Sequence, residues 1–213
     1  MRESTGNGDE LSENQPPPES RFVRLGLLFY GAMAVAGVVW RVGFYREPMF
    51  FLDPAGTPAD IVWGRDLGLG VATAAVLIVG SDWMTRATHW GDELARAMAR
   101  ALGPLSVPNA VLLAFASGFA EELFFRGALQ PRAGLVLASL LFGCVHFVPQ
   151  RAFLPWTAFA VVAGFLFGGL LLFTGNLIAP IVAHTLVNAI NLPLLVRRYG
   201  ESAPATPDGD APS

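Results

Sequence analysis

Six apolar runs separated by short polar or proline-containing segments dominate the sequence; they cover about residues 24–44, 66–80, 107–130, 133–147, 154–173 and 177–196. A helix needs about 20 predominantly apolar residues to cross the hydrocarbon of a bilayer. Lipid offers no hydrogen bonds to the backbone, so chains of such runs fold as helical bundles or closed barrels. No run alternates with the period of a strand, which excludes a barrel. The sequence predicts an all-α membrane bundle of about six transmembrane helices.

The composition agrees with a membrane protein. Of the 213 residues, 53% are hydrophobic and only 15% are charged, whereas soluble domains have about 25% charged residues. The net charge of −3 and the absence of a basic run argue against nucleic-acid binding. Cys144 is the single cysteine, which excludes an internal disulfide framework and a multi-cysteine metal site.

Three further segments complete the predicted domain organisation. Residues 1–20 and 199–213 are polar and rich in proline, as disordered tails are, and flank a transmembrane domain over 21–198. Residues 81–102 predict an amphipathic helix in the membrane interface, anchored by Trp83 and Trp90, with His89 solvated. The distribution of arginines among the loops favours a multi-pass protein of the inner or plasma membrane with both termini in the cytoplasm.

Three charges interrupt the third apolar run: Glu121, Glu122 and Arg126. An ionisable residue at membrane depth costs at least ~2.5–3.5 kcal/mol, which makes it a candidate functional residue. Glu122 and Arg126 are spaced i,i+4 on one helix face and are expected to pair, a pairing that also suits a structural role. Glu121 points about 100° away, so its partner must come from another helix.

Other polar side chains lie at a matching depth. His146 is in the fourth run, and His184, Asn188 and Asn191 share one face of the sixth. At 1.5 Å per residue, Glu121 lies roughly 15 Å from the nearest predicted turn, and His146, His184 and Asn188 lie roughly 20, 12 and 18 Å from theirs. Taken alone, an intramembrane histidine or asparagine also serves to hold helices together. Together, the set predicts one buried site.

Such a site is suited to hydrolysis. A buried carboxylate facing an imidazole can hold and deprotonate a water molecule, and a second imidazole and an amide can stabilise an oxyanion. No serine stands in a GxSxG sequence. Zinc bound by Glu121, His146 and His184 is the alternative, although the HExxH sequence is absent.

Three motifs resemble those of the CAAX protease and bacteriocin-processing (CPBP, or Abi) family of intramembrane endopeptidases: EExxxR, FxxxH and HxxxN. In this chain they are Glu121-Glu122-xxx-Arg126, Phe142-xxx-His146 and His184-xxx-Asn188. The resemblance covers about residues 107–196.

The resemblance implies a glutamate-type endopeptidase that cuts a membrane-attached protein near its C-terminus or anchor. Glu121 would be the general base, His146 would help hold the water, and His184 and Asn188 would form the oxyanion hole. Glu122 and Arg126, the other two residues of the first motif, would support the site. No cofactor is expected unless zinc is bound, and lipid and a membrane-anchored protein or peptide are the expected partners. The alternatives are a catalytically silent scaffold or immunity protein of the same fold and a proton-coupled carrier.

Overall fold

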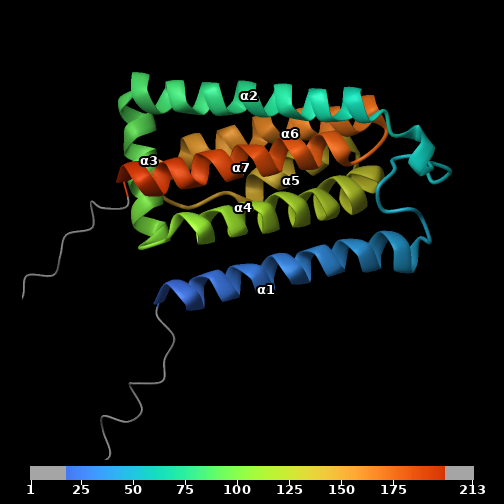
Figure 1. Cartoon of the computed structure of the whole chain (residues 1–213), viewed down its shortest axis with the longest axis horizontal. Helices are drawn as coiled ribbons and strands as arrows, with labels where there is room; N and C mark the ends of the chain where they lie inside the picture. The colour runs from blue at the N-terminus through green and yellow to red at the C-terminus, as the bar shows by residue number, and fades with distance from the viewer. Residues whose placement is uncertain (1–17, 200–213) are drawn as a thin grey trace, which may run out of the picture.

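The computed structural model describes residues 18–199, which form a helical bundle with no strand in that range (Figure 1). The α-helices are α1 (Pro18–Val38), α2 (Trp63–Ala87), α3 (His89–Leu102), α4 (Val107–Glu121), α5 (Gln130–Val145), α6 (Leu154–Thr174) and α7 (Ile178–Tyr199). Two π-helical segments, η1 (Val39–Phe44) and η3 (Glu122–Leu129), continue α1 and α4, and two short 3₁₀ turns are η2 (Pro58–Asp60) and η4 (Arg151–Phe153). The predicted all-α membrane fold is confirmed.

Five helical segments of this range are long and apolar enough to cross a membrane. The third, Val107–Val145, has 39 residues and contains both the third and the fourth predicted spans. The chain reverses within it, because Glu121 and His146 come within 3.7 Å of each other. The reversal falls at Gly134, with φ 77° and ψ 168°, and not at Pro131, which lies between the third and fourth predicted runs. Glycine adopts positive φ without a steric penalty, whereas proline is accepted in the first turn of a helix.

The predicted boundary between the second span and the amphipathic helix is wrong. α2 extends to Ala87, so Ser81–Ala87 belong to the span, and only α3 lies across the end of the bundle (Figure 1). The polar residues that suggested an interfacial helix are accommodated within α2, since the Ser81 and Thr85 hydroxyls donate to carbonyls of the preceding turn. Thr88 separates the two helices and caps α3 by accepting a hydrogen bond from the Gly91 N–H.

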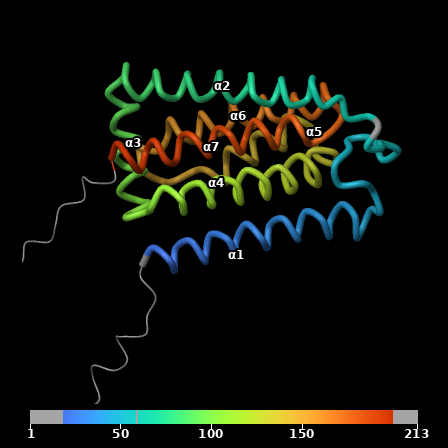
Figure 2. The backbone as a smooth tube through the Cα atoms, in the orientation of Figure 1, coloured from blue at the N-terminus to red at the C-terminus, as the bar shows by residue number. Residues whose placement is uncertain are grey.

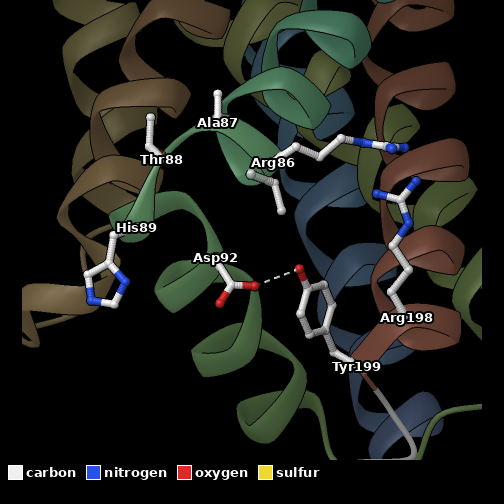
Figure 3. A pocket seen from close by; sticks show the side chains of 8 residues that line it. Arg86, Ala87, Thr88, His89, Asp92, Arg198 and Tyr199 are labelled. Carbon is white, nitrogen blue, oxygen red and sulfur yellow. Dashed lines mark hydrogen bonds between the residues drawn. The ribbon is translucent and has the colours of Figure 1, made fainter.

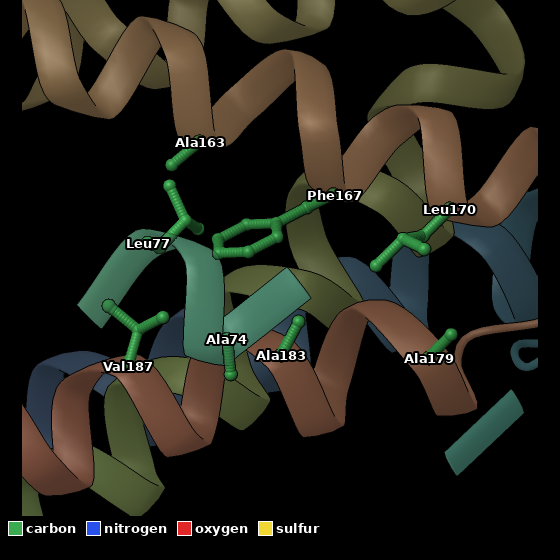
Figure 4. Close-up of a cluster of buried hydrophobic side chains, with 8 residues drawn as sticks. All are labelled: Ala74, Leu77, Ala163, Phe167, Leu170, Ala179, Ala183 and Val187. Atoms are coloured by element: carbon green, nitrogen blue, oxygen red, sulfur yellow. The ribbon is translucent and has the colours of Figure 1, made fainter. Parts of the chain in front are cut away.

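α7 lies between α2 and α4 and forms the centre of the bundle (Figure 1). Figure 4 shows side chains of α2, α6 and α7 packed into one apolar cluster: Ala74, Leu77, Ala163, Phe167, Leu170, Ala179, Ala183 and Val187. Small residues let membrane helices approach closely. At Gly70 of α2, for example, an added Cβ would stand 2.8 Å from the Ala179 carbonyl oxygen. This packing fixes the helix that carries His184.

α1 packs on the outside of α4 and η3, and it begins at the end of the bundle where α7 finishes and where α3 lies (Figure 2). The described chain therefore enters and leaves the bundle on one side. α1 starts three residues before the predicted domain boundary at residue 21. Residues 1–17 and 200–213, which make up most of the two predicted tails, lie outside the described residues.

Candidate active site

The paired glutamates lie where α4 passes into the π-helical segment η3. π-Helical turns inside α-helices are frequent at functional sites. Glu122 is fully buried, and its Oε1 lies 3.0 Å from Nη1 of Arg126, which confirms the predicted pair. Arg126 also donates to the Gly164 carbonyl of α6 at 3.2 Å and stands 4.2 Å above the Phe142 ring. Its charge is thus held by a carboxylate, a carbonyl and an aromatic face.

His184 brings the two glutamates into one network. Its Nδ1 lies 2.8 Å from Glu122 Oε1, a contact that helical spacing did not predict, and its Nε2 lies 4.0 Å from Glu121 Oε2. The imidazole stacks on Phe167 of α6, with ring centroids 4.9 Å apart. Nothing in the sequence distinguishes Phe167 from the other apolar residues of its run, so its role could not be predicted.

His146 directly follows the last residue of α5 and approaches the same oxygen of Glu121. Its Nε2 lies 3.7 Å from Glu121 Oε2, while its Nδ1 lies 2.7 Å from the Phe142 carbonyl oxygen. A carbonyl only accepts hydrogen bonds, so Nδ1 carries the proton. Trp156 packs edge-on against the ring at 5.2 Å. The imidazole is therefore fixed in both orientation and tautomer.

The geometry around Glu121 leaves three acceptor atoms facing one another. In each neutral imidazole Nδ1 is the donor, toward Phe142 or Glu122, so both Nε2 atoms present lone pairs to Glu121. The carboxylate is 7% exposed, and its Oε2 accepts no hydrogen bond from residues 18–199. The separations of 3.7 and 4.0 Å exceed a direct hydrogen bond and suit a bridging water. The predicted convergence of Glu121, His146 and His184 is thus present.

Asn188 lies one turn beyond His184 and donates to the Ser117 hydroxyl at 2.9 Å. A primary amide has two N–H donors, so this contact orients the group and leaves one donor. Asn191, the next polar residue on this face, donates to Ser81 of α2 at 3.0 Å. Ser117 was missed in the sequence, although its position four residues before Glu121 places both on one helix face.

A cavity of about 720 Å³ opens onto these side chains. Glu121, His146, His184 and Asn188 all line it, and most of the remaining lining is apolar, including residues of α1 and α3. Tyr30 of α1 lines it as well and was also missed, because a tyrosine in an apolar run carries no distinguishing spacing. The charged pair Glu122–Arg126 lies behind the cavity wall. The site is thus an apolar chamber with a few convergent polar groups, as small-molecule and peptide sites are.

The residues of the zinc alternative were tested against this geometry. Glu121, His146 and His184 supply one oxygen and two nitrogens, a known zinc donor set. Within residues 18–199, however, no group of three or more His, Cys, Asp or Glu side chains has an arrangement that could hold a metal ion.

Comparison with known proteins adds the family. Residues 103–190 match the family model described as type II CAAX prenyl endopeptidase Rce1-like. This part of the chain is similar to that family. The match contains all three motifs, from Glu121 to Asn188, and so confirms the resemblance read from the sequence. The five apolar segments indicate a multi-pass membrane protein, and the matched region is similar to a protease family.

One curated relative is the uncharacterized protein YpbD of Bacillus subtilis (strain 168). The two chains are 40% identical over 87 residues, which is 40% of this chain and 44% of the relative. The matched region thus spans less than half of either protein. No solved structure matches the chain.

Proposed function

We propose that this protein is an intramembrane endopeptidase in which Glu121 activates a water molecule to hydrolyse a peptide bond. The observation that carries the proposal is the arrangement at Glu121, where a buried carboxylate oxygen faces the Nε2 atoms of His146 and His184 at 3.7 and 4.0 Å. Three acceptors around one position suit a molecule that supplies protons, as water does. The match to a protease family over residues 103–190 supports the same reaction.

In the proposed reaction, Glu121 takes a proton from the water as its oxygen attacks the carbonyl carbon of the substrate. The carbonyl π electrons move to oxygen and form a tetrahedral oxyanion. The carbon–nitrogen bond then breaks, and the proton held by Glu121 passes to the leaving amine. Atoms and charge balance without a further reactant, and Glu121 returns to the carboxylate.

Donors for the oxyanion come from α7. Asn188 has one amide N–H beyond the one that bonds Ser117. His184 donates from Nε2 only when the ring is doubly protonated, because Nδ1 already donates to Glu122. Glu122, whose Oε1 lies 2.8 Å from Nδ1, is thus assigned as the residue that orients His184, and Arg126 as the residue that holds Glu122.

The proposed substrate is a membrane-attached protein, cut near its C-terminus or anchor. The cavity supports this class because it is largely apolar and reaches from Glu121 to the N-terminal half of α1 and to α3. α3 lies at the end of the bundle where α1 begins, where α2 and α7 end and where η4 contacts α3. These segments carry eight arginines: Arg21, Arg24, Arg86, Arg96, Arg100, Arg151, Arg197 and Arg198. The positive-inside rule makes this the cytoplasmic side, so we assign both ends of the bundle domain to the cytoplasm of the inner or plasma membrane.

The test is cleavage of co-expressed membrane-anchored substrates, prenylated and unprenylated, by the wild type, Glu121→Gln and the matched control Glu93→Gln. Glu93 is exposed on α3, away from the cavity. We expect Glu121→Gln to abolish cutting, Glu93→Gln to retain it, and a chelator to leave it unchanged. Loss of cutting on chelation with restoration by zinc would instead assign Glu121, His146 and His184 as metal ligands. Equal cutting by Glu121→Gln would refute the mechanism, and absence of cutting by the wild type across the panel would favour the scaffold alternative.

A further inference from the structure

A second, polar pocket lies at the end of the bundle where α2, α3 and α7 meet (Figure 3). It measures about 560 Å³ and is lined by the last turn of α2, the first residues of α3 and the end of α7. Arg86 and Arg198 extend toward each other on one side, and His89 lies on the other (Figure 3). None of these residues falls within the family match at residues 103–190.

Asp82 holds the two guanidinium groups together. Its Oδ2 lies 2.8 Å from Nε of Arg86, and its Oδ1 lies 2.6 Å from Nη1 of Arg198. One carboxylate between two cations leaves one net positive charge. Each guanidinium has five N–H donors in a planar fork, and within residues 18–199 the two side chains form no other ion pair or hydrogen bond. Most of their donors are therefore available to a ligand.

The other carboxylate of the pocket does not cancel this charge. Asp92 accepts hydrogen bonds from Arg96 at 2.8 Å and from Tyr199 at 3.0 Å (Figure 3 draws the second). These donors lower the pKa of Asp92 and keep it ionised but paired. Arg86 and Arg198 also favour the C-terminal ends of their helices, which accounts for the presence of basic residues there but not for their convergence on one cavity.

The depth of the pocket is that of lipid headgroups. The candidate spans of α2 and α7 end at Ala87 and Tyr199, both of which line it. Trp83 and Trp90, 65% and 43% exposed, are close in sequence to its lining residues, and tryptophan marks the membrane–water interface. Basic pockets between transmembrane helices at this level bind anionic headgroups.

We propose that this pocket binds the phosphate of an anionic phospholipid through Arg86 and Arg198. Arginine matches phosphate oxygens with paired hydrogen bonds. Thr85, Arg198 and Tyr199 line both this pocket and the apolar cavity of the candidate active site. A ligand with an anionic head and a hydrocarbon chain fits the junction, with the chain directed into the apolar cavity. A bound anionic lipid would thus contact the apolar cavity of the candidate active site, so the lipid composition of the membrane would affect that cavity.

The carboxylate of a substrate C-terminus is the rival anion. Arg198 is fourteen residues after His184 on α7, which separates the two by roughly 21 Å along the helix. An extended peptide advances at most ~3.6 Å per residue, so the substrate carboxylate would have to lie about six residues beyond the cleaved bond to span this separation. This distance favours the lipid. The lipid proposal itself does not depend on the protease activity.

The experiment measures lipid retention and thermal unfolding of the full chain in detergent with added phosphatidylglycerol or phosphatidylcholine. Arg86→Gln, Arg198→Gln and Arg86→Lys are compared with Arg100→Gln, a matched control at an exposed arginine of α3 outside the pocket. Native mass spectrometry counts the bound lipid. Only variants whose unfolding temperature in phosphatidylcholine equals that of the wild type enter the comparison, and Arg86→Lys, which keeps the charge, provides a variant expected to fold.

We expect the wild type and Arg100→Gln to retain phosphatidylglycerol and to be stabilised by it. Each arginine removed should weaken this binding about fivefold, and Arg86→Lys should weaken it less. Equal retention of both lipids, or unchanged phosphatidylglycerol binding in Arg86→Gln and Arg198→Gln, would overturn the proposal. Stabilisation by glycerol phosphate as strong as by the lipid would reassign the site to a soluble phosphate. Competition by a peptide with a free C-terminus, but not by its amide, would reassign it to the substrate.

Discussion

Gly118 of α4 sets the distance between the glutamates and His184, and Gly118→Ala tests the proposed architecture of the site. A Cβ at this position would lie 2.7 Å from Thr185 Cα and 2.8 Å from Thr185 N. Ordinary van der Waals contact begins at 3.4 Å, so α4 and α7 would have to separate by about 0.7 Å. Two of the three obstructing atoms belong to the Thr185 backbone and the third is its Oγ1, so a rotamer change alone cannot relieve the clash.

The separation acts directly on the 2.8 Å contact between Glu122 and His184, because these residues follow Gly118 and precede Thr185 on the same two helices. Overpacking costs about 1–3 kcal/mol, offset by the ~0.5–1 kcal/mol that alanine gains over glycine in a helix. The variant should thus unfold more readily by about 0.5–2 kcal/mol. Misplacement of catalytic groups by about 1 Å can lower the rate about a hundredfold, and we expect cleavage to fall between about tenfold and a hundredfold.

Gly169→Ala in α6 is the matched control, since an added Cβ there meets no atom within 4 Å. The same substitution should leave cleavage unchanged and leave stability equal or slightly higher. Thermal unfolding in detergent and cleavage of a co-expressed substrate measure both variants side by side. The reasoning is refuted if Gly118→Ala is as stable and as active as Gly169→Ala.

Three further predictions concern buried or exposed charges. Replacing Arg126 by Met leaves the carboxylate of Glu122 buried beside His184 without its cation, and should destabilise the protein by about 3–5 kcal/mol in thermal unfolding; unchanged stability would mean that Glu122 is neutral. Arg41, 1% exposed, donates to the carbonyls of Gly127, Phe51 and Leu52, so Arg41→Met should cost about 1.5–3 kcal/mol and increase proteolysis of the loop after η1, whereas an unchanged digestion pattern would contradict this. The hydrogen bond from Arg132 lowers the pKa of Glu47 below its ordinary 4.5. Stabilisation by this pair should therefore be present above pH 4.5 and be lost as the pH falls through the lowered pKa, so the difference in unfolding temperature between wild type and Glu47→Gln should vanish in acid. A difference that persists at low pH would contradict the ionic origin.

The candidate site could be predicted in part because helical spacing is local. The i,i+4 pairing of Glu122 with Arg126, and the depth at which Glu121, His146 and His184 meet, follow from the rise per residue and from the positions of turns. The EExxxR, FxxxH and HxxxN motifs are also recognisable in the sequence, because each of them spans only one or two helical turns. The contact between His184 and Glu122 could not be predicted, because the rotation of α7 about its axis depends on its packing against α2 and α4.

Boundaries were less predictable than the site. Ser81 and Asp82 looked like the start of an interfacial helix, yet they remain within α2, because backbone carbonyls and Arg198 satisfy them in the folded bundle. The chain reverses at Gly134, three residues after Pro131. Proline and glycine are both common in turns, and the packing of α5 on α6 selects the glycine.

The sequence by itself determined the all-α membrane architecture and the identity of the polar residues at membrane depth. Both follow from the absence of hydrogen-bond partners in lipid and from the cost of burying a charge. Only the tertiary structure decided which nitrogen of each imidazole faces Glu121, that Ser117 and Phe167 fix Asn188 and His184, and that Arg86 and Arg198 share one pocket. These relations join residues far apart in the chain. They depend on how closely the helices approach, and glycines such as Gly118 set that distance.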